Sequence, residues 1–243
     1  MNLKECNAVV TGGGVRLGRA MAIALAEAGA NVAVHYNSSE GPAKEVAAEV
    51  ERHGVKAALV QADLSGPVEA ASTIFKVAQR ELGPIHVLIN SAAIFEQSDL
   101  LSTTEDQWDR HQTINLKAPF FVSQAFVRQL PADQQGHIIN IVDWRGTRPP
   151  ADYIAYTPTK VALVGLTKSL AQSLAPQVQV NAIAPGAILP GPQETEEHFE
   201  ARRTEIPMRR IGDPAFISDA MLYFLRSEFV TGEVMHVTGG ESL

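Results

Sequence analysis

The chain has 243 residues, of which 45% are hydrophobic and 19% are charged, and its formal net charge is −7. A chain of this length can bury a sizeable core, and we expect a single domain over residues 1–243 rather than two small ones. The negative charge offers no basic surface to nucleic acid, so we expect no nucleic-acid partner.

The sequence shows no sign of secretion or of membrane insertion. Cys6 is the only cysteine, so an internal disulfide cannot form. No charged start with a long apolar run precedes the first predicted strand, and no segment has the roughly 20 apolar residues needed to cross a bilayer. We therefore expect a cytoplasmic protein without a membrane partner.

Short β-rich segments alternate with longer helical segments along the whole chain. Seven strands are predicted, at Asn7–Thr11, Asn31–Tyr36, Lys56–Gln61, Ile85–Asn90, Gly136–Val142, Val178–Ile183 and Glu233–Val237. Six helices are predicted, at Leu17–Ala28, Gly41–His53, Pro67–Leu82, Thr104–Leu130, Tyr153–Ala175 and Pro214–Ser227. This alternation predicts an α/β, single-domain, doubly wound Rossmann fold, with a seven-stranded parallel sheet and helices on both faces. The segment Pro185–Glu200 has no predicted element and is expected to be a mobile flap over a site.

A glycine-rich turn joins the first predicted strand to the first helix, with the sequence Thr11-Gly12-Gly13-Gly14-Val15-Arg16-Leu17-Gly18. Glycines let the backbone approach a pyrophosphate, and a helix N-terminus supplies free N–H groups. A tight turn without a ligand is the alternative, but the place of this turn in the first βαβ unit favours a dinucleotide. We therefore predict that the cofactor contacts Gly12, Arg16, Leu17 and Gly18.

The second predicted strand ends in His35-Tyr36-Asn37-Ser38-Ser39, without the carboxylate that usually accepts both ribose hydroxyls of NAD. Amide and hydroxyl groups can instead hydrogen-bond a 2′-phosphate, and Arg16 could reach it as a charged fork. Alternatively, Arg16 is a solvated arginine and the two serines cap the next helix. The pattern favours NADP(H), with Tyr36, Asn37, Ser38 and Ser39 around its phosphorylated ribose.

Several motifs, in the same order, resemble those of the short-chain dehydrogenase/reductase family over nearly the whole chain. The family's Thr-Gly-x-x-x-Gly-x-Gly turn resembles Thr11–Gly18, and its Tyr-x-x-x-Lys signature resembles Tyr156–Lys160. Further motifs resemble Ala62-Asp63-Leu64, Asn90-Ser91-Ala92-Ala93, Ile114-Asn115-Leu116, Pro185-Gly186 and Gly239-Gly240. The resemblance implies an oxidoreductase whose cofactor also contacts Asp63, Leu64, Asn90, Ser91, Ala92, Pro185 and Gly186. It further implies a homotetramer in which the helices 104–130 and 153–175 pack across a two-fold axis.

Two departures from the family pattern resemble one subgroup, the pteridine reductases. Arg16 stands at the second glycine of the turn, and Asp143 stands where most members carry a catalytic serine, 156 − 143 = 13 positions before Tyr156. This resemblance implies reduction of a pterin with NADPH. Pteridine reductases often place an aromatic residue four positions after the asparagine of the Asn-x-Ala motif, to stack on the pterin. In this chain Ile94 stands there and Phe95 follows, so the sequence leaves the stacking residue open.

Tyr156 and Lys160 are one helical turn apart, so their side chains can converge on one ligand. The Lys160 ammonium is expected to favour the phenolate and to lower the Tyr156 pKa from about 10 toward the working pH. Lys160 is also expected to hold the nicotinamide ribose. Taken alone, the two residues would be better explained as a core tyrosine and a solvated lysine. The other motifs in register favour the catalytic interpretation.

Asp143 follows the fifth predicted strand, at the sheet edge where open α/β proteins bind ligands. A partly buried carboxyl with a raised pKa could protonate a ring nitrogen while hydride reaches the adjacent carbon. Alternatively, Asp143 caps a loop or pairs with Arg145 or Arg148. By resemblance, Asn115 is expected to bend its helix and to anchor a water that relays protons to Lys160. Its alternative is a polar residue that faces solvent.

The predicted catalytic residues are thus Asp143, Tyr156, Lys160 and Asn115, and the predicted substrate-binding residues are Asp143, Tyr156, Phe95, Trp144 and Ile188. Isolated apolar residues such as the last three are more often plain packing residues. The histidines His86, His111, His137 and His236 have no carboxylate or cysteine companion at ligand spacing, so no metal is expected.

Three functions stay open on the sequence. They are reduction of a pterin-like C=N substrate, reduction of a ketone or 3-oxoacyl carbonyl, and a non-catalytic module that senses NADP(H). An acid at Asp143 favours the first, because imine chemistry gains more from a true acid than carbonyl reduction does. The presence of Tyr156, Lys160 and Asn115 argues against the sensor.

Overall fold

The computed structural model describes residues 1–146, 149–191 and 194–243. In these residues one parallel sheet of seven strands has the order β3-β2-β1-β4-β5-β6-β7. The strands are β1 (Asn7–Thr11), β2 (Asn31–Tyr36), β3 (Ala57–Gln61), β4 (Val87–Asn90), β5 (Gly136–Ile141), β6 (Val178–Pro185) and β7 (Val234–Val237). Five of the seven are buried along nearly their whole length, and β3 is buried at alternate residues, as strands between two helical layers should be.

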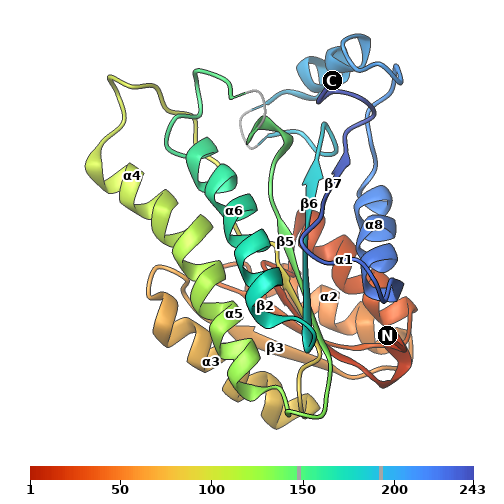
Figure 1. The fold of residues 1–243 in the computed structure, drawn as a ribbon. Coiled ribbons are helices and arrows are strands. Elements are labelled where there is room, and N and C mark those ends of the chain that lie inside the picture. Colours follow the sequence, from red (N-terminus) through yellow and green to blue (C-terminus); the bar gives the residue numbers. More distant parts are fainter. Residues whose placement is uncertain (147–148, 192–193) are drawn as a thin grey trace.

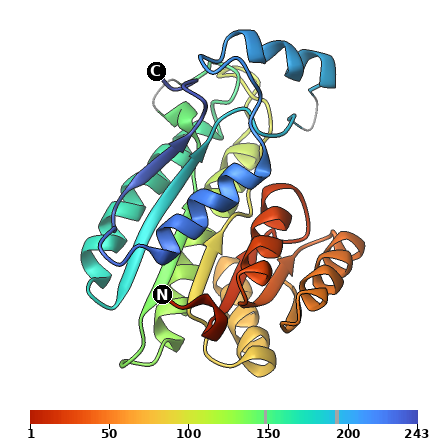
Figure 2. The same ribbon diagram turned by 90° about the vertical axis from the view of Figure 1, so that its right-hand side faces the viewer.

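Helices cover both faces of the sheet (Figures 1 and 2). One face packs against α1 (Arg16–Glu27), α2 (Glu40–Arg52) and α8 (Pro214–Arg226), which contribute to one apolar core cluster. The other face packs against α3 (Pro67–Leu82), α5 (Ala118–Gln129) and α6 (Thr157–Leu174), around a second cluster. The predicted three-layer, doubly wound fold is confirmed.

The strand order reverses between β1 and β4, which are neighbours in the middle of the sheet. From β1 the chain continues to β2 and β3 on one side, and from β4 to β5, β6 and β7 on the other. In open α/β sheets, ligands bind beyond the carboxyl ends of the strands at such a switch point. The segments that follow β1, β4, β5 and β6 carry the glycine-rich turn, Ser91, Asp143 and Gly186. The topology therefore brings the motifs that the sequence singles out to one edge of the sheet.

The predicted helix Thr104–Leu130 is not a single regular helix. It consists of α4 (Glu105–Gln112), a π-helical segment at Thr113–Lys117 and α5. The interruption coincides with Asn115, whose amide group bonds to both backbone groups of Ile94 on the neighbouring segment. A local irregularity at Asn115 was expected, but the apolar periodicity could not show its type, because π and α turns differ by only one residue.

The predicted helix Tyr153–Ala175 begins four residues later, as α6. Tyr153 instead forms a parallel bridge with Ser98. The Ser98 N–H donates to the Asp152 carbonyl at 2.9 Å, and the Ile154 N–H donates to the Ser98 carbonyl at 3.1 Å. These two long-range backbone bonds hold the segment before α6 extended, and they fix the place of Tyr156 at the start of the helix.

The segment Pro185–Glu200 contains more structure than expected. Its first residue ends β6, and its last residues belong to α7 (Glu196–Ala201), where the Thr195 hydroxyl accepts the His198 N–H. A helix this short gives too little periodicity to be recognised in the sequence. Pro192 and Gln193 lie outside the described residues, and the mobility of this flap stays a prediction. Among the helices of the described residues, none is both long and apolar enough to span a membrane.

Candidate active site

The glycine-rich turn after β1 has little room for side chains. A Cβ atom on Gly18 would lie 2.1 Å from the Gly12 carbonyl oxygen, and one on Gly12 would lie 3.0 Å from the Cα atom of Ala92. Helix α1 starts at Arg16 without an acidic residue in its first turn, and Val15 before it provides no side-chain cap. The first N–H groups of α1 are therefore not capped by a side chain, and this end of the helix attracts anions. This geometry fits a dinucleotide pyrophosphate. Leu17, in the first turn of α1, packs against the core.

His35, in β2, holds this turn in place, a role that the sequence analysis did not assign. Its Nδ1 atom accepts the Gly12 N–H at 3.1 Å, and its Nε2 atom lies 3.0 Å from the Ala62 carbonyl oxygen. Burial lowers the His35 pKa to about 4, against the opposing hydrogen bond to Ala62, so the ring is neutral near pH 7. A neutral ring can accept at one nitrogen and donate at the other, as both contacts require. The sign of this role in the sequence is a histidine inside a mostly apolar predicted strand.

The ends of β2 and β3 carry polar groups where the phosphorylated ribose of NADP(H) is predicted to bind. Asn37 and Ser38 are exposed, and the Ser39 side chain makes no capping bond to α2, although Ser39 is the residue before that helix. Tyr36, by contrast, is buried in the core. The Asp63 carboxylate is exposed and accepts the Ser65 N–H at 2.9 Å, a bond that holds the Asp63 pKa below its usual value. Beyond it, Leu64 is buried.

Arg16 has a left-handed backbone conformation, with φ of 51°, which is uncommon for a residue other than glycine. Its Nη2 atom donates to the Pro190 carbonyl at 2.7 Å, so it bridges the turn and the segment after β6. That segment follows Pro185 and Gly186, where a Cβ on the glycine would lie 2.7 Å from the Thr238 Cα atom. Arg16 is thus tied to the flap, and its predicted contact with a 2′-phosphate stays a prediction.

The end of β4 is fixed to β1 and to the core. The Thr11 hydroxyl accepts the N–H groups of Ser91 and Ala92 at 3.0 and 3.1 Å. The Asn90 side chain turns inward and donates to the Asn140 amide oxygen at 2.9 Å and to the Ser123 hydroxyl at 3.2 Å. Its side chain is therefore a structural group, and only its backbone remains for the predicted cofactor contact.

Asp143 and Tyr156 meet directly. The Tyr156 hydroxyl donates to Asp143 Oδ2 at 3.0 Å, and the Asp143 side chain is only 10% exposed. The Arg145 N–H donates to Asp143 Oδ1 at 2.8 Å, and Arg145 Nη1 lies 3.3 Å from Oδ2. The alternative pairing of Asp143 with Arg145 is therefore also present, in the same site. Arg148, the other alternative partner, lies outside the described residues.

The expectation of a lowered Tyr156 pKa is wrong for this structure. The pKa of Tyr156 is raised well above its ordinary value, first by burial and then by the negative charge of Asp143 and the hydrogen bond to it. The positive charge of Arg145 opposes this shift. A buried phenolate beside a carboxylate is costly, so the hydroxyl keeps its proton.

Lys160 and Asn115 are both buried, and Lys160 lies close to this pair. Lys160 Nζ donates to the Ile141 carbonyl at 2.8 Å and lies 5.7 Å from the centre of the Tyr156 ring. Burial lowers the Lys160 pKa to about 8, although Asp143 opposes the shift. The Asn115 amide accepts the Ile94 N–H and donates to the Ile94 carbonyl, both at 2.9 Å, and does not face solvent. Its water relay stays a prediction.

Aromatic rings border the Asp143–Tyr156 pair. Phe95 stacks on Tyr153, with centroids 4.3 Å apart, and presents an edge contact to Tyr156 at 4.7 Å. Trp144 follows Asp143 in a 3₁₀ turn. Phe95 therefore supplies an aromatic ring next to Tyr156, with Tyr153 as a partner that the sequence analysis passed over, and its contact with a substrate stays a prediction. Ile188, a predicted pocket residue, is instead packed in the main core.

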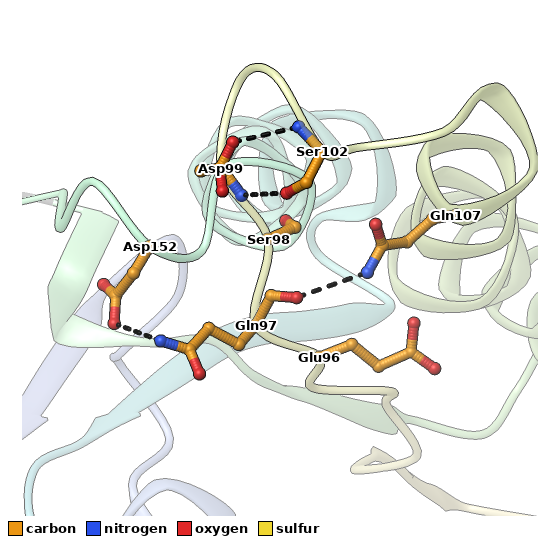
Figure 3. Close-up of a pocket in the computed structure, with 7 residues that line it drawn as sticks. All are labelled: Glu96, Gln97, Ser98, Asp99, Ser102, Gln107 and Asp152. Atoms are coloured by element: carbon orange, nitrogen blue, oxygen red, sulfur yellow. Dashed lines mark hydrogen bonds between the residues drawn. The ribbon is translucent and has the colours of Figure 1, made fainter.

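A polar pocket of about 530 Å³ is lined by residues of the segments that carry these rings, and by Gln107 of α4 (Figure 3). Its walls are Glu96, Gln97, Ser98, Asp99, Ser102, Gln107 and Asp152, none of which was a predicted site residue. Glu96 directly follows Phe95, and Asp152 directly precedes Tyr153, so the pocket adjoins the stacked rings along the chain. Within the described part of the chain, no three histidine, cysteine, aspartate or glutamate side chains are grouped to hold a metal ion.

The fold and the site together define a dinucleotide-dependent α/β oxidoreductase, and comparison with known proteins agrees. Residues 14–242 match the family model described as enoyl-(acyl carrier protein) reductase. A 3-oxoacyl-[acyl-carrier-protein] reductase FabG of Staphylococcus aureus is 34% identical over 239 residues, which cover 96% of this chain and 97% of the relative.

Two solved structures are similar over almost their whole length. The FolM alternative dihydrofolate reductase 1 of Brucella canis, complexed with NADP, is 34% identical, with a TM-score of 0.94 over 99% of this chain and 95% of that one. A blue fluorescent protein from a metagenomic library, in complex with NADPH, is 32% identical, with a TM-score of 0.91 over the full length of both chains. The chain belongs to the short-chain dehydrogenase/reductase family.

The role of His35 predicts a pH dependence of stability. The His35 pKa is about 4 in the folded protein and about 6.5 in the unfolded chain, so the unfolded state binds more protons between these values. The stabilisation is complete above about pH 6.5 and is lost as the pH falls toward 4. In His35→Gln, which cannot titrate, the decrease in unfolding free energy between about pH 7.5 and pH 5 should be smaller by roughly 2 kcal/mol, measured by urea denaturation.

The control is His53→Gln, because His53 is exposed at the end of α2 and should leave the pH dependence as it is in the parent protein. An unchanged pH dependence in His35→Gln would contradict the assignment of a neutral, buried imidazole.

Proposed function

We propose that this enzyme reduces the C=N bond of a pterin-like substrate with NADPH. The observation that carries the proposal is the Asp143 carboxyl group, in hydrogen-bond contact with the Tyr156 hydroxyl at the position of the usual family serine. A carboxyl group can deliver a proton to a ring nitrogen, a task for which a serine hydroxyl is far too weak an acid. The name of the similar FolM proteins, alternative dihydrofolate reductase, supports the same substrate class.

The cofactor assignment is based on the turn after β1 and on the end of β2. Uncapped N–H groups of α1 suit the pyrophosphate, and Ser38, Ser39 and Arg16 supply donors without a competing carboxylate at the strand end. Arg16 has five N–H donors, and its hydrogen bond to the Pro190 carbonyl uses one of them, so others can donate to a phosphate. Three similar structures are complexes with NADP and another is a complex with NADPH. The remaining predicted contacts, from Asp63 to Gly186, belong to this proposal.

The proton path follows from the contacts around Asp143. When bound, NADPH supplies the hydride to the substrate carbon. Asp143 takes the proton of the Tyr156 hydroxyl across the existing 3.0 Å hydrogen bond and passes it to the adjacent nitrogen. The raised pKa of Tyr156 keeps that proton on the phenol until Asp143 can take it. Lys160 lies on the same side of α6, where it is placed to hold the ribose and return the proton to Tyr156.

Reduction of a 3-oxoacyl carbonyl is the second candidate. The curated relatives named 3-oxoacyl-[acyl-carrier-protein] reductase favour it, at 32–34% identity over nearly the whole chain. In that reaction Tyr156 would protonate the carbonyl oxygen directly, and Asp143 would act only as its hydrogen-bond partner. The flat aromatic surfaces of Phe95 and Trp144 beside Asp143 suit a planar heterocycle better than an acyl chain.

Replacing Asp143 by serine tests the proposed function. Asp143→Ser restores the residue usual in the family but removes the acid, so kcat/KM for a dihydropterin should fall by about 10²–10³-fold. The activity is followed as NADPH oxidation with dihydropterins, dihydrofolate and β-keto esters. Reduction of β-keto esters should fall much less, because Tyr156 alone can protonate an oxygen.

Asp133→Ser is the matched control, because this exposed aspartate lies before β5, at the opposite edge of the sheet. Undiminished pterin reduction in Asp143→Ser would remove Asp143 from the mechanism. Turnover of β-keto esters alone would instead favour the second candidate, and NADPH binding without oxidation of any substrate would favour the sensor.

We further propose that the protein assembles as a homotetramer through α5 and α6, which lie side by side on one face of the sheet (Figure 1). Phe120 on α5 and Val161 on α6 are large apolar residues that are 40% and 47% exposed. Gly165, one turn after Val161, leaves open space on α6 for a helix of a second copy. Cytoplasmic location is also part of this proposal.

A charge on this face should break the assembly. Phe120→Glu or Val161→Glu should lower the mass in solution from four chains to two or one, because burying an unpaired carboxylate is costly. Size-exclusion chromatography with light scattering measures the mass. Val68→Glu, on the exposed side of α3, is the control. A monomeric parent protein would contradict the proposed assembly.

A further inference from the structure

Arg145 makes two contacts with Asp143, although the proposed proton path gives it no task. Its backbone N–H donates to Asp143 Oδ1 at 2.8 Å, and its side-chain Nη1 atom donates to Oδ2 at 3.3 Å. Oδ2 is also the oxygen that accepts the Tyr156 hydroxyl, at 3.0 Å. One carboxylate oxygen therefore joins the guanidinium group to the phenol.

The proposed proton path changes the charges around this oxygen. The Tyr156 O–H bond breaks, the proton forms a bond to Asp143, and Asp143 then passes it to the substrate atom beside the carbon that receives the hydride. At that point Asp143 is a carboxylate again, and Tyr156 has become a phenolate. Two negative charges now lie next to each other in a largely buried site. Because like charges repel strongly where water is excluded, this state needs a cation close to both oxygens.

Lys160 is the cation that the sequence analysis expected to stabilise the phenolate. In the structure its Nζ atom donates to the Ile141 carbonyl at 2.8 Å and lies 5.7 Å from the centre of the Tyr156 ring. Burial lowers the Lys160 pKa to about 8, although Asp143 opposes the shift, so its charge is lost as the pH rises through that value. A guanidinium keeps its charge there, and Arg145 donates to the oxygen that receives the Tyr156 proton.

We propose that Arg145 is a positioning residue for proton transfer, whose guanidinium offsets the second negative charge that forms when Tyr156 gives up its proton through Asp143. The inference rests on the proton path of the proposed function, in which Tyr156 is the donor, but not on the identity of the substrate. In line with it, the positive charge of Arg145 acts to lower the Tyr156 pKa, against burial and Asp143. The Arg145 side chain is 21% exposed, so water screens part of its charge, and we expect a moderate effect.

Other ionisable groups lie near Tyr156 or act on its neighbours, and they come from several segments. They are Asp143 after β5, Tyr153 before α6, Lys160 on α6, and Glu194 and Arg202 after β6, the last two acting on Tyr153. A test of Arg145 must therefore separate its charge from that of Lys160, the other cation beside the Tyr156 ring.

The test titrates position 156 in the free enzyme, with Tyr156 replaced by 3,5-difluorotyrosine, a phenol acidic enough to ionise at moderate pH. Phenolate absorption is followed with Arg145 present and in Arg145→Met, which keeps the aliphatic stem. The transition should lie about one pH unit higher in Arg145→Met, because the cation that shares Oδ2 with the phenol is gone. Arg145→Gln should show the same shift, and Arg145→Lys, which keeps a positive charge, should show much less of it.

Matched variants separate this effect from general changes. Arg52→Met, on the exposed surface of α2, should leave the transition in place, and Lys160→Met should raise it by less than Arg145→Met does. Unchanged NADP⁺ binding shows that each variant is folded. An unchanged transition in both Arg145→Met and Arg145→Gln would overturn the proposal, and so would a larger shift in Lys160→Met.

Turnover gives a second readout, which a purely structural arginine would not move in the same way. With any substrate that the parent protein reduces, Arg145→Met should lower kcat by about three- to ten-fold and leave KM nearly unchanged, with a smaller loss in Arg145→Lys. A loss in KM alone would contradict the proposal. The titration needs no turnover, so a parent protein that shows the Arg145 shift but reduces no dihydropterin would refute the proposed substrate alone.

Discussion

The hydrogen bond between the Tyr156 hydroxyl and the Asp143 carboxylate is the interaction on which the proposed chemistry of this protein depends. It joins the start of α6 to the end of β5, and both partners are largely shielded from water. Burial and the neighbouring charge keep the proton on the phenol, so the free enzyme stores it beside the group that would pass it on. Lys160 Nζ lies 5.7 Å from the centre of the Tyr156 ring, and Arg145 Nη1 lies 3.3 Å from Asp143 Oδ2, so each partner of this bond has a basic side chain near it.

The scaffold places this bond through contacts that are distant in sequence. The parallel strands put the ends of β1, β4 and β5 at one edge, and buried polar groups then fix each end. His35 holds the turn after β1, Thr11 holds the segment after β4, and Asn115 holds Ile94 against the π-helical segment. Each of these groups is satisfied at both of its polar ends, as buried polar groups must be to avoid a desolvation penalty. The site is therefore rigid on the cofactor side, where the pyrophosphate would be bound.

The fold, and the candidate residues Asp143, Tyr156 and Lys160, could be predicted from the sequence because both depend on local patterns. Strand and helix periodicity located all seven strands, and the motif spacing located Tyr156 and Lys160. The features that it missed depend on contacts across the chain. The bridge between Ser98 and Tyr153 makes α6 begin later than predicted, and the raised Tyr156 pKa results first from burial and then from Asp143, thirteen residues earlier. The packing of Phe95 against Tyr153 and Tyr156 likewise needs rings from two separate segments, so no local pattern could reveal it.

The Tyr156 pKa tests the central interaction most directly. Phenolate absorption is titrated with alkali in the parent protein, in Tyr156→Phe to identify the transition of that residue, and in Asp143→Asn. We expect the Tyr156 transition well above the ordinary phenol value of about 10 in the parent protein, and at lower pH in Asp143→Asn, where the negative charge is gone. A parent Tyr156 that ionises below its ordinary pKa, or a transition that Asp143→Asn leaves in place, would contradict the account.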